Sequence, residues 1–172
     1  MKMIFLGIGS NLSSSFGNRF ANINLAMSYL EKYEIQVIKK SSFYETPSYP
    51  NKENPKFINA VILVETILPP IDLMSVLIFI EEKLERKRGK KNDPRTCDID
   101  IIDYNSQILN LRYNNLDLTV PHKELTSRNF ILFPLQEISP TWKHPKTKEI
   151  VSVLLQKLSE EDKNSILKID EN

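Results

Sequence analysis

Ten residues near the middle of the chain, FINAVILVET at 57–66, limit the fold more than any other segment. Apolar side chains occupy both the odd and the even positions, so a strand built from this segment is apolar on both faces. Such a strand belongs inside a sheet and not at its exposed edge. The sequence therefore predicts a central strand at 57–66.

Strand and helix patterns alternate around this segment. Apolar or β-branched runs predict strands at 2–9, 35–46 and 97–104, and the helical spacing of apolar residues predicts helices at 20–30 and 69–87. The order is β-α-β-β-α-β, followed by a mixed tail from about residue 105 that adds C-terminal elements. This order predicts an α+β sandwich, in which helices pack on one mostly antiparallel sheet.

Each predicted helix carries an apolar stripe that we expect to face the sheet. The stripes consist of Ile23, Ala26, Met27 and Leu30 in the first helix, and of Leu73, Leu77, Ile80 and Leu84 in the second. Three prolines and the lack of any periodicity make 46–55 a loop. The polar last residues, 159–172, are expected to form a helix or a frayed end.

Composition limits the class of protein. The 172 residues are 41% hydrophobic and 26% charged, and without a repeat or linker they predict one domain over 1–172. A net charge of +1 gives no general attraction to nucleic acid, so any anion site must be local. The longest apolar run is too short to span a bilayer, and the lone Cys97 suits a reducing compartment. We expect a cytoplasmic monomer with no membrane or nucleic-acid partner.

The stretch DPRTCDIDIIDY at 93–104 places two carboxylates in an otherwise apolar strand. Side chains alternate along a strand, so Asp98 and Asp100 share one face while Ile99 and Ile101 share the other. Two carboxylates so close repel each other unless a cation lies between them. Mg²⁺ prefers oxygen ligands and is often held by one or two carboxylates plus substrate phosphates. The alternative is a strand face that is acidic and simply exposed to solvent.

A basic segment at 83–95 precedes the acidic pair. Arginine binds phosphate with two parallel hydrogen bonds, so Arg86, Arg88 and Arg95 are better candidates for a polyphosphate site than the neighbouring lysines. The alternative for the lysines is a solvated run of charge. Glu81 lies just off the apolar stripe of its helix, and it is either a third carboxylate of the site or a glutamate on the helix surface.

The motif GIGSN at 7–11 joins a strand to a helix. It lacks the third glycine of a dinucleotide site and the lysine of a P-loop, so it predicts a tight connection in which Ser10 or Asn11 caps the helix. In the central strand, Phe57 and Asn59 share a face. An aromatic ring beside an amide can stack on and hydrogen-bond a flat heterocycle, although aromatic residues on strands usually belong to the core.

Two further candidates lie downstream. His122 follows a strand-like segment and can donate to a phosphate, although an ordinary surface histidine also fits. Arg128 and Phe130 flank Asn129 near a predicted helix start, where they can serve an anion and a ring. Two histidines and one cysteine make a zinc site unlikely on composition, and no Ser–His–Asp or Cys–His arrangement supports nucleophilic catalysis.

These segments together resemble one family. The stretches GIGSNL, SSFYETP, FINAVILVET, IEEKLERKR, PRTCDIDI and VPHKELTSRNFILFPLQEISP are similar, in this order, to those of 6-hydroxymethyl-7,8-dihydropterin pyrophosphokinases of folate biosynthesis. The resemblance covers roughly residues 3 to 140, and the P-R-T-x-D-I-D core with V-P-H and R-x-F downstream is its most specific part. It implies a ferredoxin-like α+β fold and a single pyrophosphokinase domain over 1–172. It also implies transfer of the β,γ-diphosphate of ATP to the hydroxymethyl group of the pterin, with release of AMP.

The resemblance also implies roles for individual residues. Asp98 and Asp100 match aspartates that hold two Mg²⁺ ions, and Arg86 and Arg95 match catalytic arginines. The pterin side is matched by Thr46, Phe57, Asn59 and Phe130, of which the two phenylalanines sandwich the ring. The nucleotide and phosphate side is matched by Glu81, Arg88, His122 and Arg128.

The chain departs from the family pattern in the basic loop. Asn92 and Asp93 stand where Trp-Gly is usual, which removes an aromatic lid, and Lys123 replaces a frequent tyrosine. Because the metal and phosphate positions are all matched, we expect activity to persist with altered loop closure. Two other functions fit parts of the sequence. A two-metal nucleotidyltransferase would attack the α-phosphorus of its nucleotide, and an RNA-binding sheet would expose a basic, aromatic face.

Overall fold

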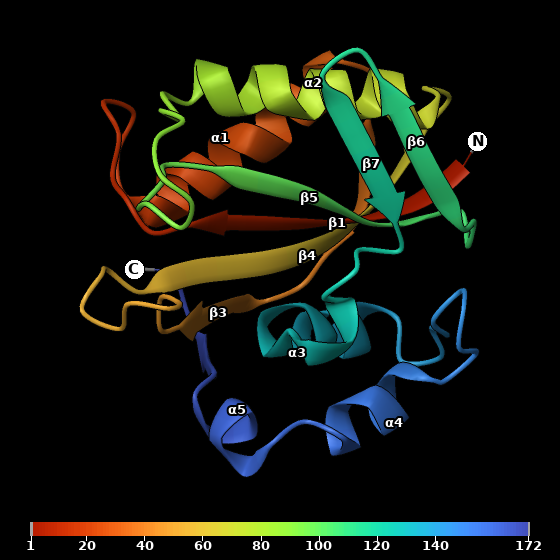
Figure 1. Cartoon of the computed structure of the whole chain (residues 1–172). Helices are drawn as coiled ribbons and strands as arrows, with labels where there is room; N and C mark the ends of the chain where they lie inside the picture. Colours follow the sequence, from red (N-terminus) through yellow and green to blue (C-terminus); the bar gives the residue numbers. More distant parts are fainter. Residues whose placement is uncertain (1, 172) are drawn as a thin grey trace.

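The computed structural model describes residues 2–171 and contains the helices and strands that the sequence predicts, with several additions (Figure 1). The main strands are β1 (Lys2–Ser10), β2 (Gln36–Lys40), β3 (Phe43–Thr46), β4 (Phe57–Thr66), β5 (Asp98–Tyr104), β6 (Leu109–Tyr113), β7 (Leu116–Val120) and β8 (Leu167–Ile169). The helices are α1 (Arg19–Lys32), α2 (Pro70–Lys83), α3 (Asn129–Ile138), α4 (Val151–Gln156) and α5 (Glu160–Asn164), with a 3₁₀ turn at Leu125–Ser127.

The main sheet is six-stranded and antiparallel throughout. Its strand order is β5-β1-β4-β3-β8, and β2 pairs with a further stretch of β4. Strand β4 therefore pairs with three neighbours, and its bounds are those predicted for the central strand. Strands β6 and β7 form a separate hairpin. The protein thus has the mixed α/β architecture, with an antiparallel sheet and packed helices, that the order of its elements predicts.

Helices cover both faces of the sheet. Figure 1 shows α1 and α2 above it, and α3 and α4 below it. The side chains of alternate strand residues supply two apolar clusters: one contains Ile62 and the stripes of α1 and α2, and the other contains Val61 and the apolar face of α3. The predicted stripes are confirmed, since every member is buried except Met27, which is partly buried. Burial of both faces explains why β4 carries apolar side chains at both its odd and its even positions.

Four local expectations differ from the structure. The single strand predicted at 35–46 is two strands, β2 and β3, which pair with different stretches of β4. Helix α1 is capped by Asn18, whose Oδ1 accepts a hydrogen bond from Ala21 N at 3.0 Å, so the predicted cap at Ser10 or Asn11 is wrong. Helix α2 ends at Lys83, shortly before Glu85, which adopts a left-handed conformation at φ 65°. The polar tail does contain a helix, α5, but it continues into β8.

A buried carboxylate ties β5 to the C-terminal part of the chain. Asp103 is 2% exposed and accepts hydrogen bonds from Trp142 Nε1 at 2.7 Å and from Ser106 N at 2.8 Å. We expect Asp103→Ala to lower the free energy of unfolding by about 2 kcal/mol, because a buried indole N–H then lacks its acceptor. Urea unfolding measures this loss as a lower midpoint at unchanged slope. If the loss is equally large in a Trp142→Phe background, the hydrogen bond is not its cause.

Candidate functional site

The glycines of the GIGSN motif place the candidate site at one end of the sheet. Gly9 of β1 lies opposite Asn59 of β4 on one side and opposite Asp98 of β5 on the other. Residues directly opposite in an antiparallel pair point to the same face. Gly9 therefore places a stretch of backbone without a side chain between the amide of Asn59 and the carboxylate of Asp98. An added Cβ at Gly9 would lie 3.1 Å from Asn59 Oδ1.

The two carboxylates of β5 each lie against arginines. Asp98 Oδ1 accepts from Arg86 Nη1 at 2.6 Å, and Asp98 Oδ2 lies 3.2 Å from Arg95 Nε. Asp100 Oδ2 accepts from Arg128 Nη1 at 3.0 Å and lies 4.0 Å from His122 Nε2. Burial raises the pKa of Asp100, and the nearby Asp98 raises it further. Both carboxylates are partly exposed but ion-paired with arginines, which argues against an acidic strand face that simply points into solvent.

Glu81 is the third carboxylate of this cluster, and it is 3% exposed. Its Oε1 accepts from Ile99 N at 2.8 Å and lies 2.6 Å from Arg86 Nη1, while its Oε2 accepts from Arg88 Nη2 at 3.0 Å. Burial raises the pKa of Glu81 to about 7, although the charge of Arg86 acts in the opposite direction. The alternative of a surface glutamate is wrong, because α2 points this side chain at the start of β5.

Each candidate aromatic residue carries an arginine over its ring, and each of these arginines also lies against one aspartate. Arg95 lies over Phe57, with its guanidinium carbon 5.2 Å from the ring centroid, and pairs with Asp98. Arg128 lies over Phe130 at 5.4 Å and pairs with Asp100. Two parallel series, aromatic to arginine to aspartate, therefore join the predicted ring site to the predicted metal site. The distances are those of cation–π contacts.

Asn59 and Thr46 form the polar part of the predicted ring site. Both are buried, and Asn59 Nδ2 donates to Thr46 Oγ1 at 2.9 Å and to Tyr44 O at 3.3 Å. These bonds fix the orientation of the amide, since its NH₂ group is committed to β3. Its Oδ1 is then turned toward the backbone of Gly9.

The unusual pair Asn92-Asp93 folds the basic loop onto itself. Asp93 Oδ2 accepts from Lys90 N at 2.8 Å, and Asp93 N donates to Lys90 O at 3.2 Å. Asn92 adopts a left-handed conformation at φ 69°, which asparagine tolerates better than most residues. The acidic side chain thus closes a turn within the loop. Residues 86–93 and Arg95 line a hollow of about 240 Å³ beside this turn.

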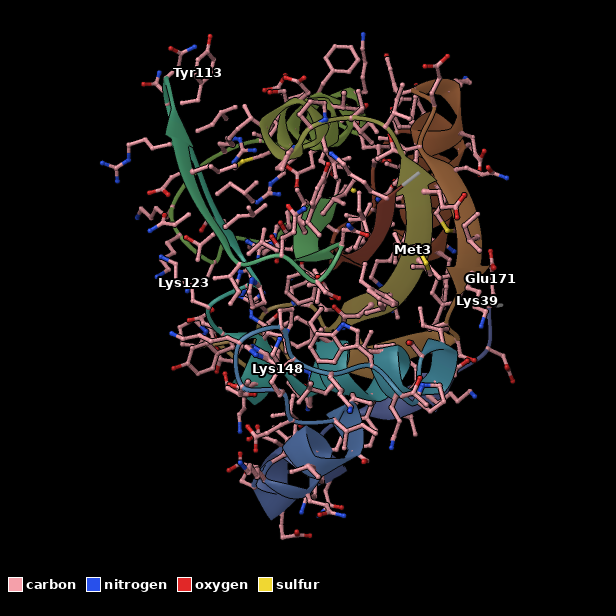
Figure 2. The ribbon with its side chains drawn as sticks, turned by 90° about the vertical axis from the view of Figure 1, so that its right-hand side faces the viewer. Met3, Lys39, Tyr113, Lys123, Lys148 and Glu171 are labelled. Atoms are coloured by element: carbon pink, nitrogen blue, oxygen red, sulfur yellow. The ribbon has the colours of Figure 1, made fainter. Side chains whose placement is uncertain are left out.

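A second hollow lies at the edge of β5, under the β6–β7 hairpin. It has a volume of about 270 Å³, and its lining includes Met74, Ile78, Asp117, Thr119 and Lys123 together with His122 and Asp100. Figure 2 shows Tyr113 at one end of the hairpin and Lys123 beyond the other, toward α3. Four residues of this lining were not predicted as site residues: Met74, Ile78, Asp117 and Thr119. The sequence signal that could have identified two of them is a second apolar row on α2, in which Met74 and Ile78 are one turn apart.

The acidic pair could hold a magnesium ion. Asp98 and Asp100 offer oxygen ligands on one face of β5 with arginines around them, which fits an ion that takes its remaining ligands from a bound polyphosphate. Within residues 2–171, no three His, Cys, Asp or Glu side chains converge as a closed metal cage. Along the same residues, no helix combines the length and the apolar character that crossing a membrane requires.

Comparison with known proteins agrees with this geometry. Residues 5–140 match the family described as 7,8-dihydro-6-hydroxymethylpterin-pyrophosphokinase. The chain is 33% identical over 145 residues to the 2-amino-4-hydroxy-6-hydroxymethyldihydropteridine pyrophosphokinase of Aquifex aeolicus, covering 84% of this chain and 85% of that protein. It is 36% identical over 158 residues to the folic acid synthesis protein fol1 of Schizosaccharomyces pombe, covering 91% of this chain but only 20% of that protein.

Solved structures show the same fold. An HPPK-DHPS structure from Plasmodium falciparum superposes with a TM-score of 0.77 at 18% identity, covering 98% of this chain and 46% of that chain. The chain thus spans about a fifth of the length of the fol1 relative and slightly under half of the Plasmodium protein. The match of the family over 136 of the 172 residues, with relatives above 30% identity, shows that this chain belongs to the 7,8-dihydro-6-hydroxymethylpterin pyrophosphokinase family.

Proposed function

We propose that this chain transfers the β,γ-diphosphate of ATP to the hydroxymethyl group of 6-hydroxymethyl-7,8-dihydropterin and releases AMP. The observation that carries the proposal is the double series Phe57–Arg95–Asp98 and Phe130–Arg128–Asp100 at one end of the sheet. It joins two rings that suit a flat heterocycle to two carboxylates that suit magnesium. Arginines that suit a polyphosphate lie between them.

The chemistry is an in-line displacement at the β-phosphorus. The pterin hydroxymethyl oxygen forms a bond to that phosphorus, the bond from the phosphorus to the AMP oxygen breaks, and the hydroxyl proton passes to water. Magnesium held by Asp98 and Asp100 would neutralise phosphate charge and lower the pKa of the attacking hydroxyl. Positioning and charge stabilisation by the protein supply the rest of the rate, since phosphoryl transfer requires no covalent intermediate.

The arginines and His122 supply hydrogen-bond donors for the polyphosphate. Arg95 Nε is buried and lies 3.2 Å from Asp98 Oδ2, but among the described residues it has no acceptor aligned for a hydrogen bond, so a bound phosphate oxygen can compete for this N–H. His122 Nδ1 accepts from Glu124 N at 3.2 Å, which leaves the ring proton on Nε2, the nitrogen that faces Asp100. Burial lowers the pKa of His122 and so favours the neutral ring. His122 therefore acts as a neutral donor to a phosphate oxygen.

The hollow under the β6–β7 hairpin is the proposed place of the nucleoside. Its walls are mainly apolar side chains from α2 and β5, and Asp100 and His122 lie at its polar side. A flat base fits between such walls while the phosphates extend toward the arginines. Glu81 supports this arrangement indirectly, because it fixes Arg86 and Arg88 beside the start of β5.

The remaining expectations from the sequence stand as parts of this proposal. We propose a single domain over residues 1–172 with two magnesium ions, acting as a cytoplasmic monomer without membrane or nucleic-acid partners. The strand order β5-β1-β4-β3, with helices after β1 and β4, supports a ferredoxin-like core. Helices over both faces of the sheet argue against the alternative of an open RNA-binding sheet.

Product analysis tests the proposed reaction. The protein is incubated with ATP, Mg²⁺ and 6-hydroxymethyl-7,8-dihydropterin, and the nucleotide products are separated. Stoichiometric AMP and pterin diphosphate are expected. Inorganic pyrophosphate with a nucleotidylated pterin would instead indicate attack on the α-phosphorus and overturn the proposal.

A methyl group at Gly9 is expected to weaken pterin binding. In Gly9→Ala the new Cβ would lie 3.1 Å from Asn59 Oδ1 and 3.5 Å from Phe57 Cδ1, and the hydrogen bonds to β3 prevent Asn59 from moving away. The added methyl takes space beside the amide and ring proposed to bind the pterin, and a loss of about 1.4 kcal/mol of binding free energy corresponds to the roughly tenfold rise in pterin KM that we expect. Steady-state kinetics at saturating ATP measures this change.

Gly7→Ala is the matched control for Gly9→Ala. Its Cβ would meet the flexible tip of Ile131 at 2.7 Å, on the same face of the sheet as Gly9 but opposite Val61 of β4 and not opposite Asn59. We expect a loss of stability with little change in the KM for the pterin. Equal pterin KM values for the two variants would contradict the role given to Gly9.

A further inference from the structure

Asn11 lies just beyond the end of β1, where three loops meet. The loops 11–18, 47–56 and 84–97 lie together at the left of Figure 1. Asn11 is 2% exposed, although it carries a polar amide. Since Asn18 caps α1, Asn11 is not needed to start the helix. Its side chain instead reaches two other loops.

Toward the phosphate side, Asn11 holds the main chain of Arg95 at two points. Its backbone N–H donates to Arg95 O at 3.0 Å, and its Oδ1 accepts from Arg95 N at 2.7 Å. This two-bond bridge fixes the peptide from which the Arg95 guanidinium extends over Phe57. A fixed peptide limits where that guanidinium can lie.

Toward the pterin side, the same amide closes the base of the 47–56 loop. Asn11 Nδ2 donates to Ser48 Oγ at 3.1 Å and to Pro55 O at 3.1 Å, and Ser48 Oγ itself donates to Pro55 O at 2.5 Å. This loop runs from Thr46 to Phe57, two residues of the proposed pterin site. One carboxamide thus contacts the segments that carry both substrates.

We propose that Asn11 is a positioning residue that fixes the 47–56 loop against the Arg95 segment, and thereby sets the distance between the bound pterin and the phosphate it attacks. This inference rests on the proposed function. Only a carboxamide meets both demands, because it combines one acceptor oxygen with two N–H donors in one plane. A carboxylate of the same shape keeps the acceptor for Arg95 N but loses both donors to the loop.

The two variants Asn11→Asp and Asn11→Ala separate these contacts. In Asn11→Asp the bond to Arg95 persists while Ser48 and Pro55 lose their donors, so the KM for the pterin should rise about tenfold with kcat within about twofold. In Asn11→Ala both sets of side-chain bonds are lost, so kcat should also fall about tenfold. A purely structural role would lower stability and leave both constants of the folded fraction unchanged.

Asn22→Asp is the matched control for a buried asparagine. Asn22 is also fully buried, and its amide donates to Leu12 O at 2.9 Å and accepts from Ser14 Oγ at 2.6 Å, within the 11–18 loop and the start of α1. The same substitution there should cost stability without moving either kinetic constant. Ser48→Ala removes the acceptor of the hydrogen bond from Asn11 Nδ2. It should raise the KM for the pterin about threefold while the protein stays folded.

The outcomes are distinct. Kinetic constants of both Asn11 variants that match the wild type, or that match Asn22→Asp, would overturn the inference. Hydrogen exchange adds a readout that does not depend on turnover: in Asn11→Asp the amides of 47–56 should exchange faster while the Arg95 amide keeps its protection. If wild-type protein forms no AMP, the proposed function fails by itself. Unchanged exchange in 47–56 overturns the positioning role whether or not AMP forms.

Discussion

Asp98→Ala is expected to reduce kcat/KM for diphosphate transfer at least roughly a thousandfold. Asp98 is the half of the acidic pair that lies against both Arg86 and Arg95. Its removal takes away a ligand of the proposed magnesium site and leaves two arginines without their shared carboxylate. The loss of several kcal/mol of charge stabilisation in the transition state corresponds to a rate loss of that order. Initial rates of AMP formation across a range of Mg²⁺ concentrations measure it.

A second acidic residue of β5 separates loss of chemistry from loss of folding. Asp103 lies on the same strand, but it bonds Trp142 and Ser106 in the core and not the site. Asp103→Asn should therefore lose stability and keep its turnover at temperatures where it remains folded. Asp98→Ala should behave in the opposite way. Calorimetry with Mg²⁺ and a non-hydrolysable ATP analogue adds a binding readout, and unchanged metal affinity in Asp98→Ala would contradict the ligand role.

The elements that could be predicted from the sequence are those whose signal is local. The strand at 57–66 has apolar residues at both odd and even positions, and the apolar stripes of α1 and α2 repeat at helical spacing. The burial of these residues therefore follows from periodicity alone. Strand β8 has only three residues, and it forms because β3 presents a free edge more than a hundred positions earlier. A pairing so distant leaves no mark in the local pattern.

In the functional site too, the features with a local sequence signal could be predicted, and those that depend on distant contacts could not. The alternation of Asp98 and Asp100 predicted that they share a face, which the register against Gly9 and Gly7 confirms. The burial of Glu81 could not be predicted from its helix, because it depends on arginines that return from the following loop. The role of Asn11 was hidden for the same reason, since its partners lie on loops about forty and eighty residues away. Its amide therefore looked like an ordinary helix cap.

Arg95→Ala is the second large effect that we expect, with kcat reduced roughly a hundredfold. Arg95 lies between Phe57 and Asp98, and its buried Nε faces Asp98 Oδ2 at 3.2 Å with no aligned hydrogen-bond acceptor among residues 2–171. A donor held in place beside the proposed metal ligand can act on charge that develops on the phosphate oxygens. Removal of one such donor typically costs about 10²–10³ in kcat. Single-turnover measurement with saturating ATP and pterin isolates this step from product release.

Two comparisons define the contribution of the guanidinium. Arg95→Lys keeps the charge but not the planar set of donors, so we expect roughly a tenfold loss, intermediate between wild type and alanine. Lys91→Ala removes a positive charge from the same basic loop, and since Lys91 is exposed and is not among the residues paired with the acidic cluster, its kcat should stay within about twofold of wild type. If Lys91→Ala and Arg95→Ala lost activity equally, general positive charge in the loop would explain catalysis better than a donor fixed at Arg95. The geometry favours the donor, because Asn11 holds the Arg95 peptide while the lysine side chains extend from a loop that closes on itself through Asp93.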